Sequence, residues 1–121
     1  MEKNYTKAQE FCKTAAMNKF TTGRLLEPKT QSFNDKVYAE SLVVYKHFKG
    51  KEDAWIGING KGGPWGYTSS ATKLVFENWA PGEPNNGAHD CAHFWKKEGK
   101  LGGKWADYPC NAKKFFICEF V

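Results

Sequence analysis

Oxygen-bearing side chains gather in the second half of the chain, in sequence typical of an irregular loop. The carboxylates are those of Glu83, Asp90 and Asp107, and the side-chain amide of Asn85 lies among them. Prolines and glycines over residues 81–87 exclude a helix or a regular strand there. Crowded carboxylates repel one another unless a cation lies between them, and calcium takes about six to eight oxygen ligands of these types. The first hypothesis is therefore a calcium-dependent binding site.

The elements that must position this loop begin with a helix predicted over residues 7–17. Thr6 and Gln9 have the spacing of a capping box, in which the threonine hydroxyl accepts a hydrogen bond from a free backbone N–H of the first turn. The apolar residues of this helix fall at helical spacing and should face the core. They are Ala8, Phe11, Cys12 and Ala15.

A second helix is predicted from Ser32, and Gly50 can close it. Between the two helices, residues 23–26 are expected to be extended and to stop at Pro28. His47 lies beside the apolar stripe of the second helix and is interpreted as a surface or half-buried residue rather than a ligand. The stripe is predicted to be core and consists of Phe33, Val37, Val44 and Phe48.

The rest of the chain has strand-like patterns separated by turns. A short apolar run over residues 53–58 predicts a strand, and residues 65–68 can return beside it. Residues 74–79 are predicted as a strand that enters the loop, and residues 91–95 as the strand that leaves it, with Ala92 and Phe94 on one face. Residues 104–107 and 115–120 are predicted to pair as the last strands. Two helices followed by strands and a long loop indicate an α+β architecture.

The composition is that of one domain, predicted over residues 1–121. With 40% hydrophobic and 16% aromatic residues, 121 residues can build one core. Because no apolar run reaches the length of a membrane span and the first residues lack a signal-peptide core, we expect a mature domain without a membrane span.

The net charge of +5 is interpreted mainly as an aid to solubility, with an anion-binding site as the alternative. No nucleic-acid motif accompanies the basic residues, so nucleic acid is not expected as a partner. The basic residues of the last quarter are Lys96, Lys97, Lys100, Lys104, Lys113 and Lys114.

The four cysteines are an even number in a small, loop-rich chain, which predicts disulfides and an oxidising, extracellular compartment. Four cysteines allow three pairings, and the residues alone do not choose among them. The alternative is a metal cluster, which is disfavoured because the sequence has no C-x-x-C pair.

Several of these motifs together resemble the C-type lectin domain and its carbohydrate-recognition loop. The resemblance covers nearly the whole chain, from about Tyr5 to Val121. It is carried by Glu83-Pro84-Asn85 four residues after a Trp, Asp90-Cys91, Trp105-Ala106-Asp107 before Cys110, the core-strand sequence Trp55-Ile56-Gly57-Ile58 and the closing Ile117-Cys118-Glu119.

The resemblance implies a C-type lectin-like fold of the short form, with two helices, two small antiparallel sheets and a long loop region. It also implies a cis peptide bond before Pro84. Among the three possible disulfide pairings, it selects Cys12 with Cys118 and Cys91 with Cys110. The tryptophans that bracket the loop, Trp79 and Trp105, would be core residues.

In calcium-binding relatives of the mannose type, the ion and two sugar hydroxyls are held by the Glu and Asn of the motif, a Glu before the central Asp-Cys, and an Asn-Asp pair. The resemblance therefore implies Glu83, Asn85 and Asp107 as calcium ligands that also bind carbohydrate. His89 occupies a carboxylate position and is a candidate carbohydrate contact. We expect Asp90 to be recruited as a further calcium ligand.

Two departures weaken this expected site. Ala106 replaces an asparagine and offers neither a calcium ligand nor an amide donor, and the imidazole of His89 is a poor ligand for a hard ion. The segment Asn59-Gly60-Lys61 lacks the acidic residues that hold an accessory calcium in many relatives. We predict that the accessory site is missing.

Three outcomes are consistent with this sequence. In the first, a weakened calcium site binds mannose-, glucose- or fucose-type hydroxyl pairs in a secreted or extracellular lectin, and assembly into a homo-oligomer raises the avidity. In the second, the domain is metal-independent and binds a protein, an anionic glycan or another surface. In the third, His89, His93 and Asp90 hold a softer metal such as zinc or copper.

An enzyme is the other class to consider. Glu83 and Asp107 have the residue types of a glycosidase pair, but the sequence shows no separate acid-binding pocket and no Ser, His and Asp constellation. Catalysis by a free cysteine conflicts with the predicted disulfides. We therefore predict a binding protein and not an enzyme.

Overall fold

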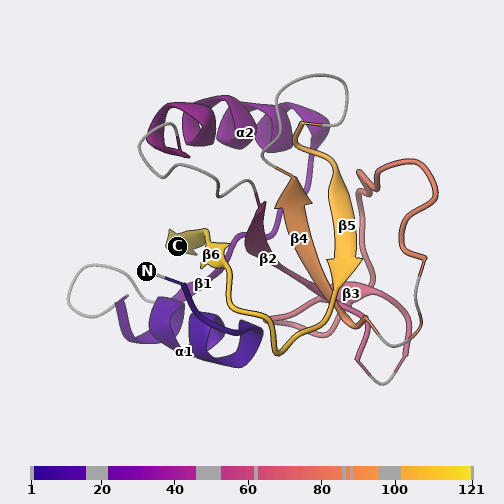
Figure 1. Ribbon diagram of the computed structural model, residues 1–121, viewed down its shortest axis with the longest axis horizontal. Coiled ribbons are helices and arrows are strands. Elements are labelled where there is room, and N and C mark those ends of the chain that lie inside the picture. Colours follow the sequence, from indigo (N-terminus) through magenta and orange to yellow (C-terminus); the bar gives the residue numbers. More distant parts are fainter. Residues whose placement is uncertain are drawn as a thin grey trace.

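The computed structural model of the chain describes residues 2–15, 22–45, 53–61, 63–85, 87, 89–95 and 102–120. Its described elements are two helices and seven short strands (Figure 1). The expected α+β class, with two helices and two small sheets, is confirmed. Neither helix is long and apolar enough to cross a membrane in the part of the chain that the structure describes.

Helix α1 runs over Tyr5–Ala15 and starts earlier than predicted. The side-chain oxygen of Asn4 accepts a hydrogen bond of 2.9 Å from the backbone N–H of Lys7. Asparagine is a preferred N-cap residue because it satisfies such free donors. Thr6 lies inside the first turn, so the predicted capping box is wrong.

The buried face of α1 is narrower than predicted. Ala8 and Cys12 are fully buried, as expected, and Tyr5 is buried with them. Phe11 is 39% exposed and packs edge-on against Phe116, with ring centroids 5.3 Å apart. Ala15, also predicted to be core, is exposed.

Helix α2 runs over Gln31–Tyr45 and is capped by Thr30, whose hydroxyl accepts a 3.1 Å hydrogen bond from the N–H of Phe33. The predicted core stripe is wrong at Phe33, which is 40% exposed, whereas Asn34 is fully buried. Val37 and Tyr38 pack against the core. The predictions for Val44, His47, Phe48 and Gly50 lie outside the described side chains.

The larger sheet has the strand order β3-β2-β4-β5, and β6 pairs with β2. The first four are antiparallel neighbours, whereas β6 runs parallel to β2, which departs from the expected antiparallel pattern. The strands are β2 (Asp53–Asn59), β3 (Gly66–Tyr67), β4 (Cys91–Trp95), β5 (Trp105–Tyr108) and β6 (Phe115–Phe116).

A two-stranded antiparallel sheet joins distant parts of the chain. It pairs β1 (Gly23–Leu25) with β7 (Cys118–Phe120). The predicted pairing of residues 104–107 with residues 115–120 is therefore wrong, because β5 pairs with β4 and β7 pairs with β1. Residues 74–79, predicted as a strand, make one isolated bridge, between Trp79 and Trp105.

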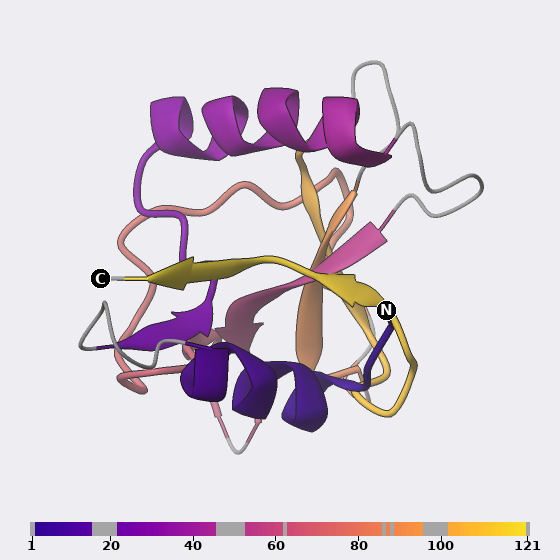
Figure 2. The ribbon, with the colours of Figure 1, turned by 90° about the vertical axis from the view of Figure 1, so that its left-hand side faces the viewer.

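Apolar clusters cover both faces of the larger sheet, with α2 over one face and α1 on the opposite side of the molecule (Figures 1 and 2). Ala92 and Phe94 share the first cluster, as predicted for one face of β4. Disulfides join Cys12 to Cys118 and Cys91 to Cys110, the pairing implied by the resemblance. The first ties α1 to β7, and the second ties the start of β4 to the segment after β5.

Candidate functional site at the rim of the long loop

The long loop before β4 is anchored to β5 by tryptophans. Trp79 packs edge-on against Trp105, with ring centroids 5.6 Å apart. Trp65 also packs edge-on against Trp79, with ring centroids 4.9 Å apart. Backbone hydrogen bonds run from Ala80 N–H to Trp105 O at 2.8 Å and from Trp105 N–H to Asn78 O at 2.9 Å. Trp105 is fully buried and Trp79 is partly buried, as expected of core residues.

Two buried asparagines hold the entry to β5, and sequence reasoning missed both. The side-chain N–H groups of Asn34 and Asn78 donate to Gly103 O at 3.0 and 2.8 Å. The oxygen of Asn34 accepts a 2.9 Å hydrogen bond from the indole N–H of Trp105. Asn34 lies three residues before Val37 on α2, so its helical phase was a signal that it faces the core.

The alternation of β5 brings Asp107 to the loop. Successive side chains of a strand point to opposite faces, so Asp107 shares the face of Trp105 while Ala106 and Tyr108 share the other. The side chain of Asp107 is fully buried. Because β5 ends beside the anchored loop, this carboxylate lies under residues 83–85.

Glu83, Asn85 and Asp107 form one hydrogen-bonded group, which we call the rim. The side-chain N–H of Asn85 donates to Glu83 Oε2 at 2.7 Å, and its backbone N–H donates to Asp107 Oδ1 at 3.3 Å. The backbone N–H of Asp107 donates to Glu83 Oε1 at 3.4 Å. The Glu83–Pro84 peptide bond is cis, as the resemblance implied. Sequence positions more than twenty apart thus meet at one point.

The two rim carboxylates repel each other. Burial, followed by the hydrogen bond and the negative charge of Asp107, raises the pKa of Glu83 above its ordinary value. Such a pair holds a proton or a cation more readily than an isolated carboxylate does. The rim is therefore an anionic site.

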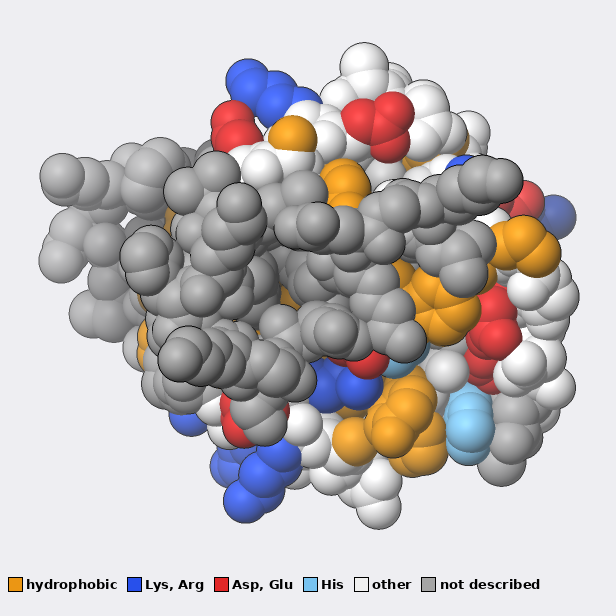
Figure 3. All heavy atoms as spheres, turned by 45° about the horizontal axis from the view of Figure 1, so that its top comes forward, with side chains coloured by type: hydrophobic (Ala, Val, Ile, Leu, Met, Phe, Trp, Pro, Cys, Tyr) orange, Lys and Arg blue, Asp and Glu red, His pale blue; other side chains and the backbone are white. Residues whose placement is uncertain are grey.

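His89 also reaches the rim. Its Nδ1 atom lies 4.0 Å from Asp107 Oδ2, and its side chain is 29% exposed. Its ring also lies over that of Tyr108, with centroids 6.0 Å apart. A space-filling view shows acidic and histidine side chains close together beside exposed hydrophobic side chains (Figure 3). His89 is therefore placed to contact whatever binds at the rim.

Two further positions of the loop region were considered in the sequence. Ala106, which offers no ligand, is 3% exposed on the face opposite Asp107. Asp90, expected as a further calcium ligand, is half-buried, and its backbone carbonyl accepts a 2.9 Å hydrogen bond from the N–H of Gly60. Within the described ranges, no three His, Cys, Asp or Glu side chains converge as a metal site would require.

His93 belongs to the opposite face of the sheet. It is 3% exposed, and its Nδ1 atom lies 3.6 Å from Asp53 Oδ2. Burial, followed by the positive charge of Lys114, lowers the pKa of His93 to about 3. Its ring packs on Tyr108 at 5.2 Å. His93 is therefore a buried packing residue on the face of the sheet opposite Asp107.

Comparison with known proteins gives a consistent result. The family model of the lectin C-type domain matches residues 1–120. The chain is 35% identical over 86 residues to salivary C-type lectin 2 of Aedes albopictus, a match covering 67% of this chain and 56% of that protein. It is 32% identical over 120 residues to collectin-43 of Bos taurus, covering 98% of this chain and 33% of that protein.

The chain thus spans about half of the mosquito protein and a third of the bovine one. Among solved structures, human lithostathine superposes with a TM-score of 0.77 at 23% identity, over 98% of this chain and 85% of that one. At this identity the superposition shows the fold alone.

Proposed function

This chain belongs to the C-type lectin domain family, and from that premise we propose that it binds carbohydrate at the rim of Glu83, Asn85 and Asp107. The observation that carries the proposal is the hydrogen-bonded convergence of these three side chains on one loop. Carboxylate oxygens accept hydrogen bonds from sugar hydroxyls, and an asparagine amide donates to them. The rim thus offers acceptors and a donor for two neighbouring hydroxyls.

Calcium is the cation that fits this donor set. The ligands are oxygens, which a hard ion prefers. The pKa of Glu83 is raised by burial first and then by Asp107, and a cation would relieve the repulsion between these two carboxylates. Glu83, Asn85 and Asp107 would hold the ion, with backbone carbonyls, water or Asp90 completing its coordination. When bound, calcium supplies positive charge to the rim and direct coordination of sugar hydroxyls. Because two carboxylates are few for such a site, the affinity is expected to be modest.

The proposed sugars are those of the mannose, glucose and fucose type. Glu83-Pro84-Asn85 resembles the motif of that specificity, and its side chains lie together here. A single site of this kind binds weakly, so assembly into a homo-oligomer would raise the avidity. Secretion to an oxidising compartment accords with both disulfides. We likewise propose a binding role for the domain rather than catalysis.

A second candidate function is binding without calcium. The observation that favours it is the small carboxylate count at the rim, together with the buried methyl group of Ala106 where a ligand would be needed. In that case the domain would bind a protein, an anionic glycan or another surface, since a fold does not determine a ligand.

Retention on mannose-agarose tests the proposal. We expect retention with millimolar calcium, release by chelator, and loss of retention in Glu83→Gln and Asp107→Asn. Glu77→Gln is the matched control, because Glu77 is an exposed carboxylate near the loop that bonds the indole N–H of Trp79 at 3.0 Å. Retention in the absence of calcium, or retention of both rim variants, would show that the chain binds mannose at another site.

A further inference from the structure

A second concave site lies outside the rim, between α1, β1 and the turn after β3. Its volume is about 350 Å³, within the range of about 300 to 1,000 Å³ that small-molecule sites occupy. It shares no residue with the rim. The side chains used below are Gln9, Lys13, Arg24, Glu27, Thr68 and Ser69, all of which line this cavity.

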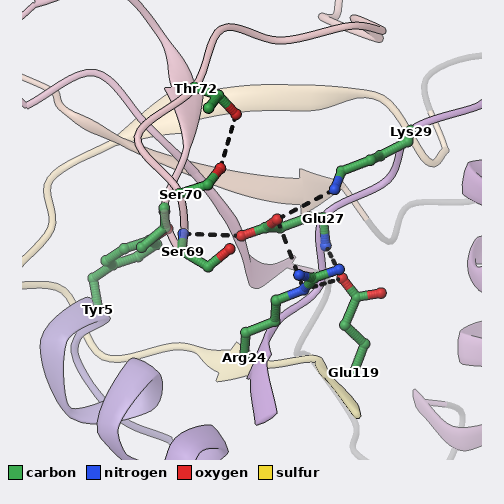
Figure 4. A network of polar contacts seen from close by, with 9 residues as sticks. Tyr5, Arg24, Glu27, Lys29, Ser69, Ser70, Thr72 and Glu119 are labelled. Atoms are coloured by element: carbon green, nitrogen blue, oxygen red, sulfur yellow. Dashed lines mark hydrogen bonds and ion pairs between the residues drawn. The ribbon is translucent and has the colours of Figure 1, made fainter. Parts of the chain in front are cut away.

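The cavity contains a buried carboxylate, that of Glu27, whose side chain is 1% exposed. One of its oxygens, Oε2, accepts a 3.0 Å hydrogen bond from the backbone N–H of Ser69. Figure 4 shows the network around it, in which Glu27 points between Ser69 and Arg24. Glu119 supports this arrangement by accepting hydrogen bonds of 2.9 Å from Arg24 Nε and from the backbone N–H of Glu27. The carboxylate is therefore held in one orientation by its surroundings.

The other oxygen of Glu27 lacks a hydrogen bond. Oε1 is buried and accepts none from the described residues, although Arg24 Nε and Lys29 Nζ each lie 3.7 Å away. These two ion pairs offset the charge of Oε1, but neither is a hydrogen bond. A buried acceptor without a donor is less favourable than one that is hydrogen-bonded. A ligand hydroxyl in the cavity would satisfy it.

The positively charged side chains that line the cavity favour a ligand that also has a negatively charged group. Lys13 of α1 and Arg24 of β1 both line the cavity, against the single carboxylate of Glu27. The guanidinium of Arg24 has five N–H donors, of which Nε–H is taken by Glu119. Gln9, Thr68 and Ser69 add polar groups that suit hydroxyls rather than an apolar surface. The lining thus combines cationic donors with a buried acceptor.

We propose that this cavity binds a small hydroxylated carboxylic acid, the chemistry of a uronic or sialic acid residue. One ligand hydroxyl donates to Glu27 Oε1, and the ligand carboxylate accepts from Lys13 and Arg24. The site is separate from the rim and requires no calcium.

Titration of the ¹⁵N-labelled chain with sodium glucuronate, in the presence of chelator, tests this proposal. Amide shifts are expected at Ser69 and over Gly23–Leu25, which flank the carboxylate and line the cavity. Methyl glucoside, which has the hydroxyls without the carboxylate, should bind at least about tenfold more weakly, since one charge-assisted contact is lost. A parallel titration with N-acetylneuraminate shows whether the cavity binds a sialic acid more tightly than a uronic acid.

Lys13→Ala should weaken glucuronate binding about tenfold, because it removes one cationic contact. Lys7→Ala is the matched control, since Lys7 lies on the same helix with a side chain 68% exposed and does not line the cavity. Glu27→Gln keeps the shape of the side chain and should also weaken binding. Equal affinity of the two lysine variants, shifts confined to the rim, or no shifts at millimolar ligand would overturn the proposal. Those results would leave mannose retention, and with it the rim, unaffected.

Discussion

The indole N–H of Trp105 donates a 2.9 Å hydrogen bond to the side-chain oxygen of Asn34, and both residues are fully buried. This contact joins α2 to the first residue of β5. Asp107 follows two residues later on the same strand face, so the position of a rim carboxylate depends on a helix residue 71 positions before Trp105.

Asn34→Ala is expected to lower the free energy of unfolding by about 2 to 3 kcal/mol, because it leaves the buried indole N–H without an acceptor. Urea unfolding monitored by tryptophan fluorescence measures the change. Lys36→Ala, at an exposed position of the same helix, should change stability by no more than about 0.5 kcal/mol. Equal effects of the two substitutions would show that the Asn34–Trp105 bond is energetically unimportant.

Calcium at millimolar concentration should raise the melting temperature, because a ligand of the native state stabilises it. Glu83→Gln should remove that increase. In chelator, however, the same variant should be no less stable than the parent chain, because the substitution also removes the repulsion from Asp107. Differential scanning calorimetry with calcium and with chelator measures the melting temperatures of the parent chain and of the variant. A calcium response that survives in Glu83→Gln would contradict the assignment of this ligand.

Stability should fall below neutral pH because of His93. Its folded-state pKa of about 3 lies below the ordinary value of 6.5, so the neutral ring stabilises the fold fully above pH 6.5. That contribution is lost as the pH falls from 6.5 toward about 3. One such group accounts for up to about 2 kcal/mol between pH 6.5 and about pH 5.

His93→Phe should flatten this pH dependence, since phenylalanine carries no proton to bind. Chemical denaturation of both chains across the acidic range makes the comparison. A parent chain and a variant with the same slope of stability against pH would mean that other groups cause the loss.

Removing the Cys12–Cys118 disulfide should destabilise the chain more than removing Cys91–Cys110. The bridged residues are 106 apart in the first case and 19 apart in the second. By loop-closure entropy the expected losses are about 5 and about 3 kcal/mol. Paired Cys→Ala variants compared by guanidinium unfolding measure the difference. The reverse order would show that native-state packing outweighs the effect on the unfolded chain.

The sequence by itself determined the elements whose signals are local. The apolar run of β2 and the alternation of Ala92 and Phe94 on β4 each lie within a few residues of sequence. The structure has both strands, and Ala92 and Phe94 lie on the same face of β4. The irregular loop around residues 83–85 could also be predicted from the sequence, because its prolines and glycines disfavour helices and regular strands. Resemblance to a family supplied the disulfide pairing, which cysteine counting left open.

Only the tertiary structure decided which distant segments meet. Phe115–Phe116 and Cys118–Phe120 looked like one strand, yet they pair with β2 and β1 of different sheets, since pairing energy depends on partners far along the chain. Asn34 was absent from the predicted core because its burial is favourable only with Trp105 and Gly103 as hydrogen-bond partners. The contact of Glu83 with Asp107 and the cavity at Glu27 arise in the same way. The periodicity of a helix or strand can be recognised from neighbouring residues, whereas a site is formed by side chains that only folding brings together.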